Sequence, residues 1–146
     1  MTKTVTRVET DRFGPIDVEA DCLFAFPVPL PGFEGTPRFA LLRLETSRPL
    51  FWLHSTEGSE VCLAVVDPWD YFPDYQPNFD PKSLQELDVG DDDEIAIYCV
   101  VAPHREGLCV NLAAPIVLFP RLGLGQQLIL NEGDLMVAVP LEDSKC

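Results

Sequence analysis

Residues 61–75 read VCLAVVDPWDYFPDY, and this stretch decides what kind of fold the chain can adopt. Its first six residues form a continuous apolar run with three valines, which is typical of a strand buried on both faces. Pro68 has no backbone N–H to donate to a sheet, so the strand is expected to end at Asp67. The stretch therefore predicts a core strand that runs directly into a proline-stiffened loop.

The loop that follows this strand carries Trp69, Tyr71, Phe72 and Tyr75. Aromatic side chains on a stiff loop suit recognition, because little conformational entropy remains to be lost when a partner docks. Large aromatic side chains are also commonly buried, so the same residues could cap the end of the core. Capping is the favoured role for Phe72, whereas Trp69 fits either role.

Short apolar runs separated by glycine, proline and polar turn signals recur along the rest of the chain. They predict an all-β fold, a small barrel or sandwich of about ten short strands with mostly antiparallel pairing. The expected strands cover residues 4–10, 15–18, 23–26, 39–44, 50–54, 61–66, 95–101, 108–111, 116–119, 127–130 and 135–139.

One short helix is expected over residues 80–87. Asp80 can cap it, Pro81 suits its first turn, and Leu84 and Leu87 lie three residues apart on one face.

Residues 27–37 hold four prolines and two glycines, a composition that excludes both helix and regular strand. An extended segment ending in a turn at Pro31-Gly32 is expected instead. Leu30 and Phe33 are expected to pack, so that the loop forms a structural clamp over one end of the barrel.

The size and composition fit one globular domain. The chain has 146 residues, 47% of them hydrophobic, and a single domain with its core over about residues 5–140 is expected. No apolar run reaches the roughly 20 residues that a membrane-spanning helix needs, and residues 1–7 have no apolar signal region. A cytoplasmic protein without membrane contact is therefore expected.

The chain is strongly acidic, with a formal net charge of −14. Residues 57–106 hold thirteen acidic side chains against Lys82 and Arg105, which gives this third of the chain a net charge of −11. Such a field repels nucleic acid and attracts basic partners, although acidic surfaces often serve solubility alone. Direct binding of RNA or DNA is therefore not expected.

Residues able to carry catalysis are few. Asp67, Asp70 and Asp74 lie on one loop and could in principle surround a metal or act as an acid–base pair, but this pattern is weakly specific. The five cysteines form no Cys-x-x-Cys pair, which argues against zinc and for reduced thiols. No enzymatic activity, metal or cofactor is expected.

Five short motifs follow one another along nearly the whole chain, from about residue 13 to residue 130. They are Phe26-Pro27 with Leu30-Pro31-Gly32-Phe33-Glu34, Pro49-Leu50-Phe51-Trp52-Leu53 with Ser55, Val66-Asp67-Pro68 with Phe72-Pro73-Asp74-Tyr75, Asn111-Leu112 with Ala114-Pro115-Ile116-Val117, and Gly125 with Gln127-Leu128-Ile129-Leu130. Each motif alone is weakly specific, but the ordered series resembles the FliW family of bacterial flagellar assembly factors.

The resemblance implies a protein that binds two partners in the cytoplasm. One partner is flagellin, and the other is CsrA, a small RNA-binding translational repressor. In the family, FliW released by flagellin export captures CsrA noncompetitively with RNA and so relieves repression of flagellin translation. We expect the acidic run Asp91, Asp92, Asp93 and Glu94 to weaken the binding of phosphate by the basic RNA-binding face of CsrA.

Partner-binding residues are expected among the exposed members of the motifs and among the loop aromatics: Phe33, Glu34, Trp69, Asp70, Tyr71 and Tyr75. Phe51, Trp52, Pro115 and Ile116 also match the family, but their strand setting predicts core positions. The main alternative function is a small-molecule or sugar-binding barrel that uses Trp69 and the neighbouring aspartates.

The sequence departs from the family pattern over residues 119–124. Where the family commonly has an asparagine and several basic residues, this chain has apolar residues and Arg121 alone. Partner choice could differ here, or the apolar residues could mark a surface for self-association.

Overall fold

The computed structural model describes residues 5–44, 50–58, 61–77, 94–104, 107–130 and 139–140. Within these ranges the chain forms eleven strands and two short 3-10 helices, η1 (Ala20–Cys22) and η3 (Pro68–Asp70). The strands are β1 (Val5–Thr10), β2 (Gly14–Glu19), β3 (Leu23–Ala25), β4 (Arg38–Leu42), β5 (Phe51–Ser55), β6 (Cys62–Val66), β7 (Ala96–His104), β8 (Gly107–Val110), β9 (Ile116–Phe119), β10 (Leu124–Gln127) and β11 (Val139–Pro140). The expected all-β fold class is confirmed.

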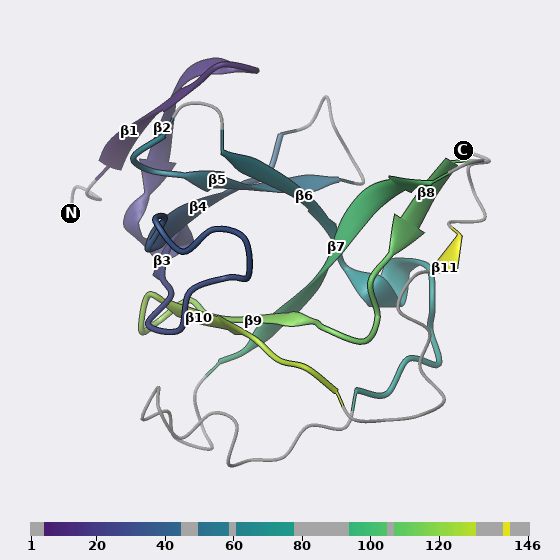
Figure 1. Ribbon diagram of the computed structural model, residues 1–146. Helices are drawn as coiled ribbons and strands as arrows, with labels where there is room; N and C mark the ends of the chain where they lie inside the picture. The colour runs from purple at the N-terminus through teal and green to yellow at the C-terminus, as the bar shows by residue number, and fades with distance from the viewer. Residues whose placement is uncertain are drawn as a thin grey trace.

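Seven of these strands close into a barrel (Figure 1). Each strand in the order β7, β6, β5, β4, β3, β10 and β9 is hydrogen-bonded to the next, and β9 pairs back to β7. The pairs are antiparallel except for β3 with β10, which is parallel and aligns Ala25 with Leu124. The closing ladder between β7 and β9 resolves the choice between barrel and sandwich in favour of the barrel.

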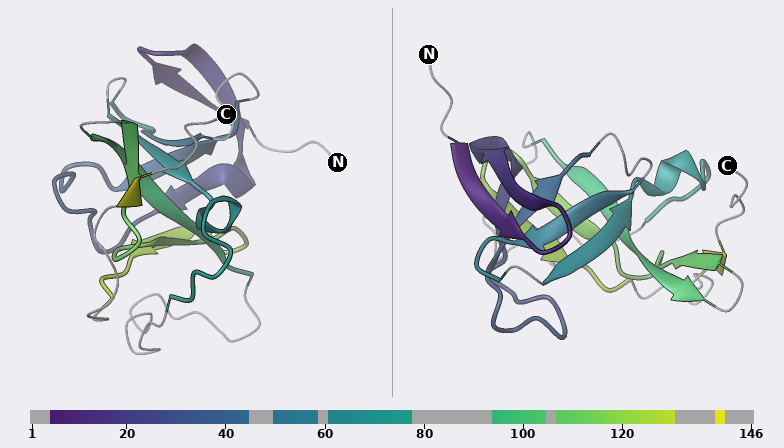
Figure 2. Two further views of the ribbon diagram at one scale, coloured as in Figure 1. Left: turned by 90° about the vertical axis from the view of Figure 1, so that its right-hand side faces the viewer. Right: turned by 90° about the horizontal axis from the view of Figure 1, so that it is seen from above.

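Strand β7 belongs to the barrel for only part of its length. Its first residues pair with β9 as far as Tyr98–Ile116, the next two pair with β6, and the rest pair with β8. The β7–β8 hairpin therefore diverges from the barrel, and Figure 2 shows it extending beyond the other strands with β11 beside it. Residues of β6, β7, β9 and β10 line a hollow in the barrel, the barrel mouth.

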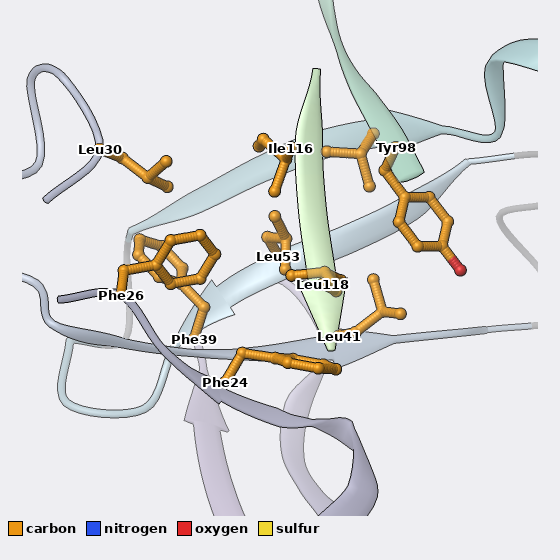
Figure 3. Packing of buried hydrophobic residues seen from close by; sticks show 10 residues of the cluster. Phe24, Phe26, Leu30, Phe39, Leu41, Leu53, Tyr98, Ile116 and Leu118 are labelled. Atoms are coloured by element: carbon orange, nitrogen blue, oxygen red, sulfur yellow. The ribbon is translucent and has the colours of Figure 1, made fainter. Parts of the chain in front are cut away.

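The inside of the barrel is packed with apolar side chains, several of which point toward one another in Figure 3. Phe26 and Phe39 meet edge to face, with ring centroids 5.5 Å apart, a favourable arrangement for aromatic rings. Gly125 faces the same space, and a Cβ there would lie 2.6 Å from Cζ of Phe26, so a larger residue would force the buried Phe26 and Leu118 side chains to shift. The core cluster comprises Phe24, Phe26, Leu30, Phe39, Leu41, Leu53, Val65, Tyr98, Ile116 and Leu118.

The β1–β2 hairpin lies on the outer face of the barrel (Figure 1). Gly14 ends its turn with a φ of +73°, a conformation that glycine adopts without steric cost. The Thr10 hydroxyl closes the turn by donating to the Gly14 carbonyl at 2.7 Å and accepting from the Phe13 N–H at 2.8 Å. The hairpin buries Val8 and Val18 in a second apolar cluster, which fixes it to the barrel.

Several element boundaries differ from the sequence expectations. The strand placed at 127–130 begins earlier, because Gly123 adopts a φ of +64° and turns the chain directly into β10 at Leu124. Leu128 and Leu130 nevertheless continue the pairing, donating to the carbonyls of Pro115 and Ala113. The expected helix over 80–87 and most of the strand over 135–139 lie outside the described residues. A single domain over 1–146 remains a prediction.

Candidate functional site

The barrel mouth is a hollow of about 310 Å³ with a mainly apolar lining. Three parts of the chain build it: the inward sides of β6, β7, β9 and β10, the segments just before β9 and after β10, and the proline-rich loop between β3 and β4. Its lining residues are Leu30, Pro31, Phe33, Leu63, Val100, Asn111, Ala114, Ile116, Gln127 and Ile129. Apolar hollows with a few polar groups are the usual form of a binding site.

The two amide side chains of the mouth hold its walls in place. Gln127 donates from Nε2 to the Ala114 carbonyl at 3.0 Å, which ties β10 to the segment before β9. The Asn111 Oδ1 atom accepts from the Ala113 N–H at 3.1 Å and stabilises the turn after β8. Both interactions fix backbone, so the mouth is a preformed surface rather than one that must be ordered on binding.

The proline-rich loop forms one wall of the mouth. Leu30 is buried in the core, and the Phe33 ring packs edge to face on Phe39 at 6.4 Å between centroids. Gly32 has a φ of +87°, and its N–H donates to the Glu34 carboxylate at 3.1 Å. The expected packing of Leu30 and Phe33 is confirmed, and the loop does lie over one end of the barrel.

Ile129 is the most exposed large apolar residue among those described, at 68% exposure, and it lies on the rim of the mouth. The inference from sequence did not select it, because it stands in an apolar run that predicts a buried strand. Its place in the motif Gln127–Leu130 was the available signal. Sequence reasoning also did not place Leu63 and Val100 in a site.

The aromatic loop, residues 67–75, is held in one conformation by its own side chains. Asp67 accepts from the Trp69 N–H at 2.9 Å and caps η3, in which Pro68 occupies the first turn. The Trp69 indole N–H donates to the Tyr75 carbonyl at 2.9 Å, and the Tyr75 hydroxyl donates to the Leu112 carbonyl at 2.6 Å. These three hydrogen bonds hold the loop together and tie it to the segment after β8.

The structure divides the six expected partner-binding residues between surface and core. Asp70 and Glu34 are exposed and Trp69 is 38% exposed, while Phe33 and Tyr71 are half-buried. The expectation that Tyr75 is exposed is wrong: it is only 7% exposed, because its hydroxyl finds a partner inside the fold.

Residues of the motifs that were expected in the core behave differently from one another. Pro115 and Ile116 are fully buried, as expected. Phe51 is half-buried and packs edge to face on Tyr98 from inside the barrel, with centroids 5.6 Å apart. Trp52 lies on the outer face, where it packs on Phe13 of the β1–β2 turn.

Burial and neighbouring charge perturb the acid–base groups near the aromatic loop. Partial burial, followed by the nearby Asp67 carboxylate, raises the pKa of Asp70. Burial raises the pKa of the Cys99 thiol to about 12, and burial also raises the pKa of Tyr75. The Cys99 thiol and the Tyr75 hydroxyl keep their protons at neutral pH because their ionised forms are poorly solvated, which does not require a catalytic role.

The acidic run behaves as a surface feature where it is described. Glu94 is exposed, and Asp91, Asp92 and Asp93 lie outside the described residues. Within the described part of the chain, no three His, Cys, Asp or Glu side chains gather in a way that could hold a metal ion. None of the described segments forms a helix long and apolar enough to cross a membrane.

A second hollow, of about 370 Å³, lies on the outer face between β1, β3 and the β9–β10 turn. Its polar lining residues are Thr6, Arg38 and Thr56. Neither this hollow nor the barrel mouth is lined by Trp69, so neither supports the alternative of a ligand site beside that residue.

Comparison with known proteins gives one consistent family. The model of the FliW protein family matches residues 7–141. A flagellar assembly factor FliW of Thermotoga neapolitana is 38% identical over 130 residues, which are 87% of each chain. The corresponding protein of Thermotoga maritima is 35% identical, over 84% of this chain and 85% of its own. A crystal structure of a flagellar assembly factor FliW superposes with a TM-score of 0.85 at 27% identity, covering 97% of this chain and all of that one.

Proposed function

The chain belongs to the FliW family of flagellar assembly factors, and from this membership we propose that it binds flagellin and the translational repressor CsrA in the cytoplasm. Flagellin binding protects the subunit before export. CsrA binding relieves repression of flagellin translation once flagellin has left. The match of one family model to nearly the whole chain is the observation that carries this proposal.

The physical character of the molecule supports a binding role. The mouth walls and the aromatic loop are both fixed by side-chain hydrogen bonds, so neither loses much conformational entropy when a partner docks. The chain carries a net charge of −14, which favours a basic partner such as CsrA and disfavours direct contact with RNA.

The acidic charge also supplies a mechanism for relief of repression. CsrA holds RNA through cationic groups, and an acidic protein docked beside that face lowers the potential that attracts phosphate. RNA binding then weakens although the RNA site itself stays uncovered. Asp91, Asp92, Asp93 and Glu94 are the proposed source of this effect.

Capture from cell lysate by the purified protein tests the two partners. Flagellin and CsrA are expected in the bound fraction, identified by mass spectrometry, and each is then measured with the purified protein by calorimetry. CsrA affinity should fall as salt rises, because screening weakens its electrostatic part. If neither purified partner binds at micromolar concentration, the proposed function is wrong.

A further inference from the structure

We propose that strand β1 pairs with β1 of a second copy of this chain, antiparallel about a two-fold axis, so that the two β1–β2 hairpins form one four-stranded sheet. β1 is hydrogen-bonded to β2 on one edge, and among the described residues no other strand pairs with it. The second edge of β1 presents the N–H and C=O groups of alternate residues, which makes it a template for another strand. The proposal does not depend on the proposed function.

The sequence of β1 suits strand pairing at this edge. Four of its six residues are β-branched, a class that favours extended strands, and none is proline. Val8 and Thr10 are buried toward the barrel, whereas Arg7 and Glu9 are exposed on the opposite face. Charged side chains at a sheet edge commonly prevent pairing with another chain, so the arrangement of these two charges decides whether a second copy is repelled or attracted.

The charges of β1 are complementary to themselves in one register. A two-fold axis perpendicular to the sheet keeps the buried faces of both copies on the same side, so the register can change only in steps of two residues. With Val8 on the axis, Arg7 of each copy lies opposite Glu9 of the other, and Thr6 lies opposite Thr10. With Arg7 or Glu9 on the axis, identical charges face each other. Opposite charges across strands stabilise a sheet and like charges destabilise it, so the register centred on Val8 is favoured.

The hairpin already places Arg7 for this pairing. Its Nε atom lies 3.5 Å from Oδ1 of Asp17, the residue opposite it on β2, and both side chains are mostly exposed. Glu9 lies opposite Pro15 on β2, which supplies no charge. In the four-stranded sheet Arg7 therefore lies between two carboxylates, and Glu9 gains a cation opposite it.

The edge of β2 does not offer the same match. Pro15 has no N–H to donate, and the charged residues of β2, Asp17 and Glu19, are both acidic. Two copies joined through β2 with Asp17, Val18 or Glu19 on the axis would bring carboxylates together, which destabilises the pairing. The self-complementary edge is therefore that of β1.

The distribution of charge along the chain favours the same end of the molecule. Residues 1–48 hold six basic and seven acidic side chains, whereas residues 49–146 hold four basic and seventeen acidic ones. Two molecules with a net charge of −14 repel each other, and contact through the nearly neutral part brings the fewest like charges together. The β1–β2 hairpin belongs to that part and lies at the opposite end of the molecule from the β7–β8 hairpin (Figures 1 and 2).

Exchange of charges on β1 tests the proposal. Sedimentation velocity of the full chain over a concentration series, at about 0.15 M salt, should show a monomer and a dimer in equilibrium. The association should be weak, because one strand pair makes an interface at the small end of the range. Arg7→Glu and Glu9→Arg each place like charges opposite one another and should weaken dimerisation by roughly tenfold or more. An equimolar mixture of the two variants should dimerise again, because each new charge then faces an opposite one.

Arg121→Glu and Glu57→Arg are the matched controls, because they make the same changes of net charge at exposed residues outside β1. Both should dimerise like the original protein. Recovery of the dimer in the mixture also shows that the two β1 variants are folded. A chain that stays monomeric up to about 1 mM overturns the proposal. So does a dimer that both β1 variants retain, a mixture that remains monomeric, or a loss of dimer that the controls share.

Discussion

At the scale of single residues, Tyr75 shows how one hydrogen bond moves a side chain from a predicted surface to the core. Its hydroxyl reaches the Leu112 carbonyl, 37 positions along the chain, and its carbonyl accepts from Trp69. Trp69 therefore packs against a buried ring while keeping part of its own surface in water. The buried Tyr75 thus holds the Trp69 ring in place at the surface, through a ring contact and a hydrogen bond.

Replacement of Tyr75 by Phe should destabilise the protein by about 1–3 kcal/mol, because the Leu112 carbonyl loses its partner inside the fold. Urea unfolding followed by circular dichroism measures the change. Unchanged unfolding midpoints would show that water or another donor replaces the hydroxyl.

The Cys99 thiol makes stability depend on pH at the alkaline end. Burial raises its pKa in the folded state to about 12, from an ordinary value of 9.0, so the unfolded chain loses this proton first. Stability is therefore expected to fall as pH rises from about 9 toward 12, because the unfolded state binds fewer protons there. Urea unfolding at pH 8 and pH 10.5 should show this, with a flatter dependence in Cys99→Ala. Equal slopes would assign the effect to other groups.

At the scale of elements, the local chemistry of proline and glycine explains where strands begin and end. Strand β6 ends at Val66, where Asp67 and Pro68 begin η3, as the proline predicted. Strand β10 begins at Leu124 rather than at residue 127, because Gly123 completes the turn earlier. Gly123 and Gly125 are separated there by one residue, Leu124, and composition alone does not say which glycine turns the chain.

The cap on η3 should stabilise the aromatic loop. Asp67→Ala removes the acceptor for the Trp69 N–H and is expected to cost about 1 kcal/mol. Asp67→Asn keeps a side-chain oxygen at the same place and should retain most of the stability. Fluorescence of Trp69 in a Trp52→Phe background, together with thermal unfolding, reports both effects. Equal losses in the two variants would indicate that charge, rather than capping, is the contribution of Asp67.

At the scale of the whole molecule, the barrel separates two kinds of surface. Apolar residues from distant parts of the chain gather at the mouth, whereas the chain as a whole carries a net charge of −14. Under the proposed function, an apolar surface and an acidic charge would suit two partners, one recognised by apolar contact and the other by charge. Strand β7, which leaves the barrel to pair with β8, contributes Val100 to the lining of the mouth.

Neutralising the acidic run tests the electrostatic part of the proposal. A variant with Asp91, Asp92 and Asp93 changed to Asn and Glu94 to Gln should keep most of its CsrA affinity but relieve RNA binding by CsrA less effectively. Calorimetry measures the first quantity, and RNA filter binding at fixed salt measures the second. Undiminished relief would show that CsrA is inhibited by a change in its shape rather than by charge.

The sequence by itself determined the fold class, the β1–β2 hairpin, the end of β6 and the packing of Leu30 and Phe33, because each depends on local properties of proline, glycine and apolar runs. Only the tertiary structure decided that the sheet closes through β7 and β9, that Tyr75 is buried, and that Ile129 lies with Leu63 and Val100 at one mouth. These features depend on contacts between residues tens of positions apart. Periodicity and turn signals carry no information about which distant strands become neighbours.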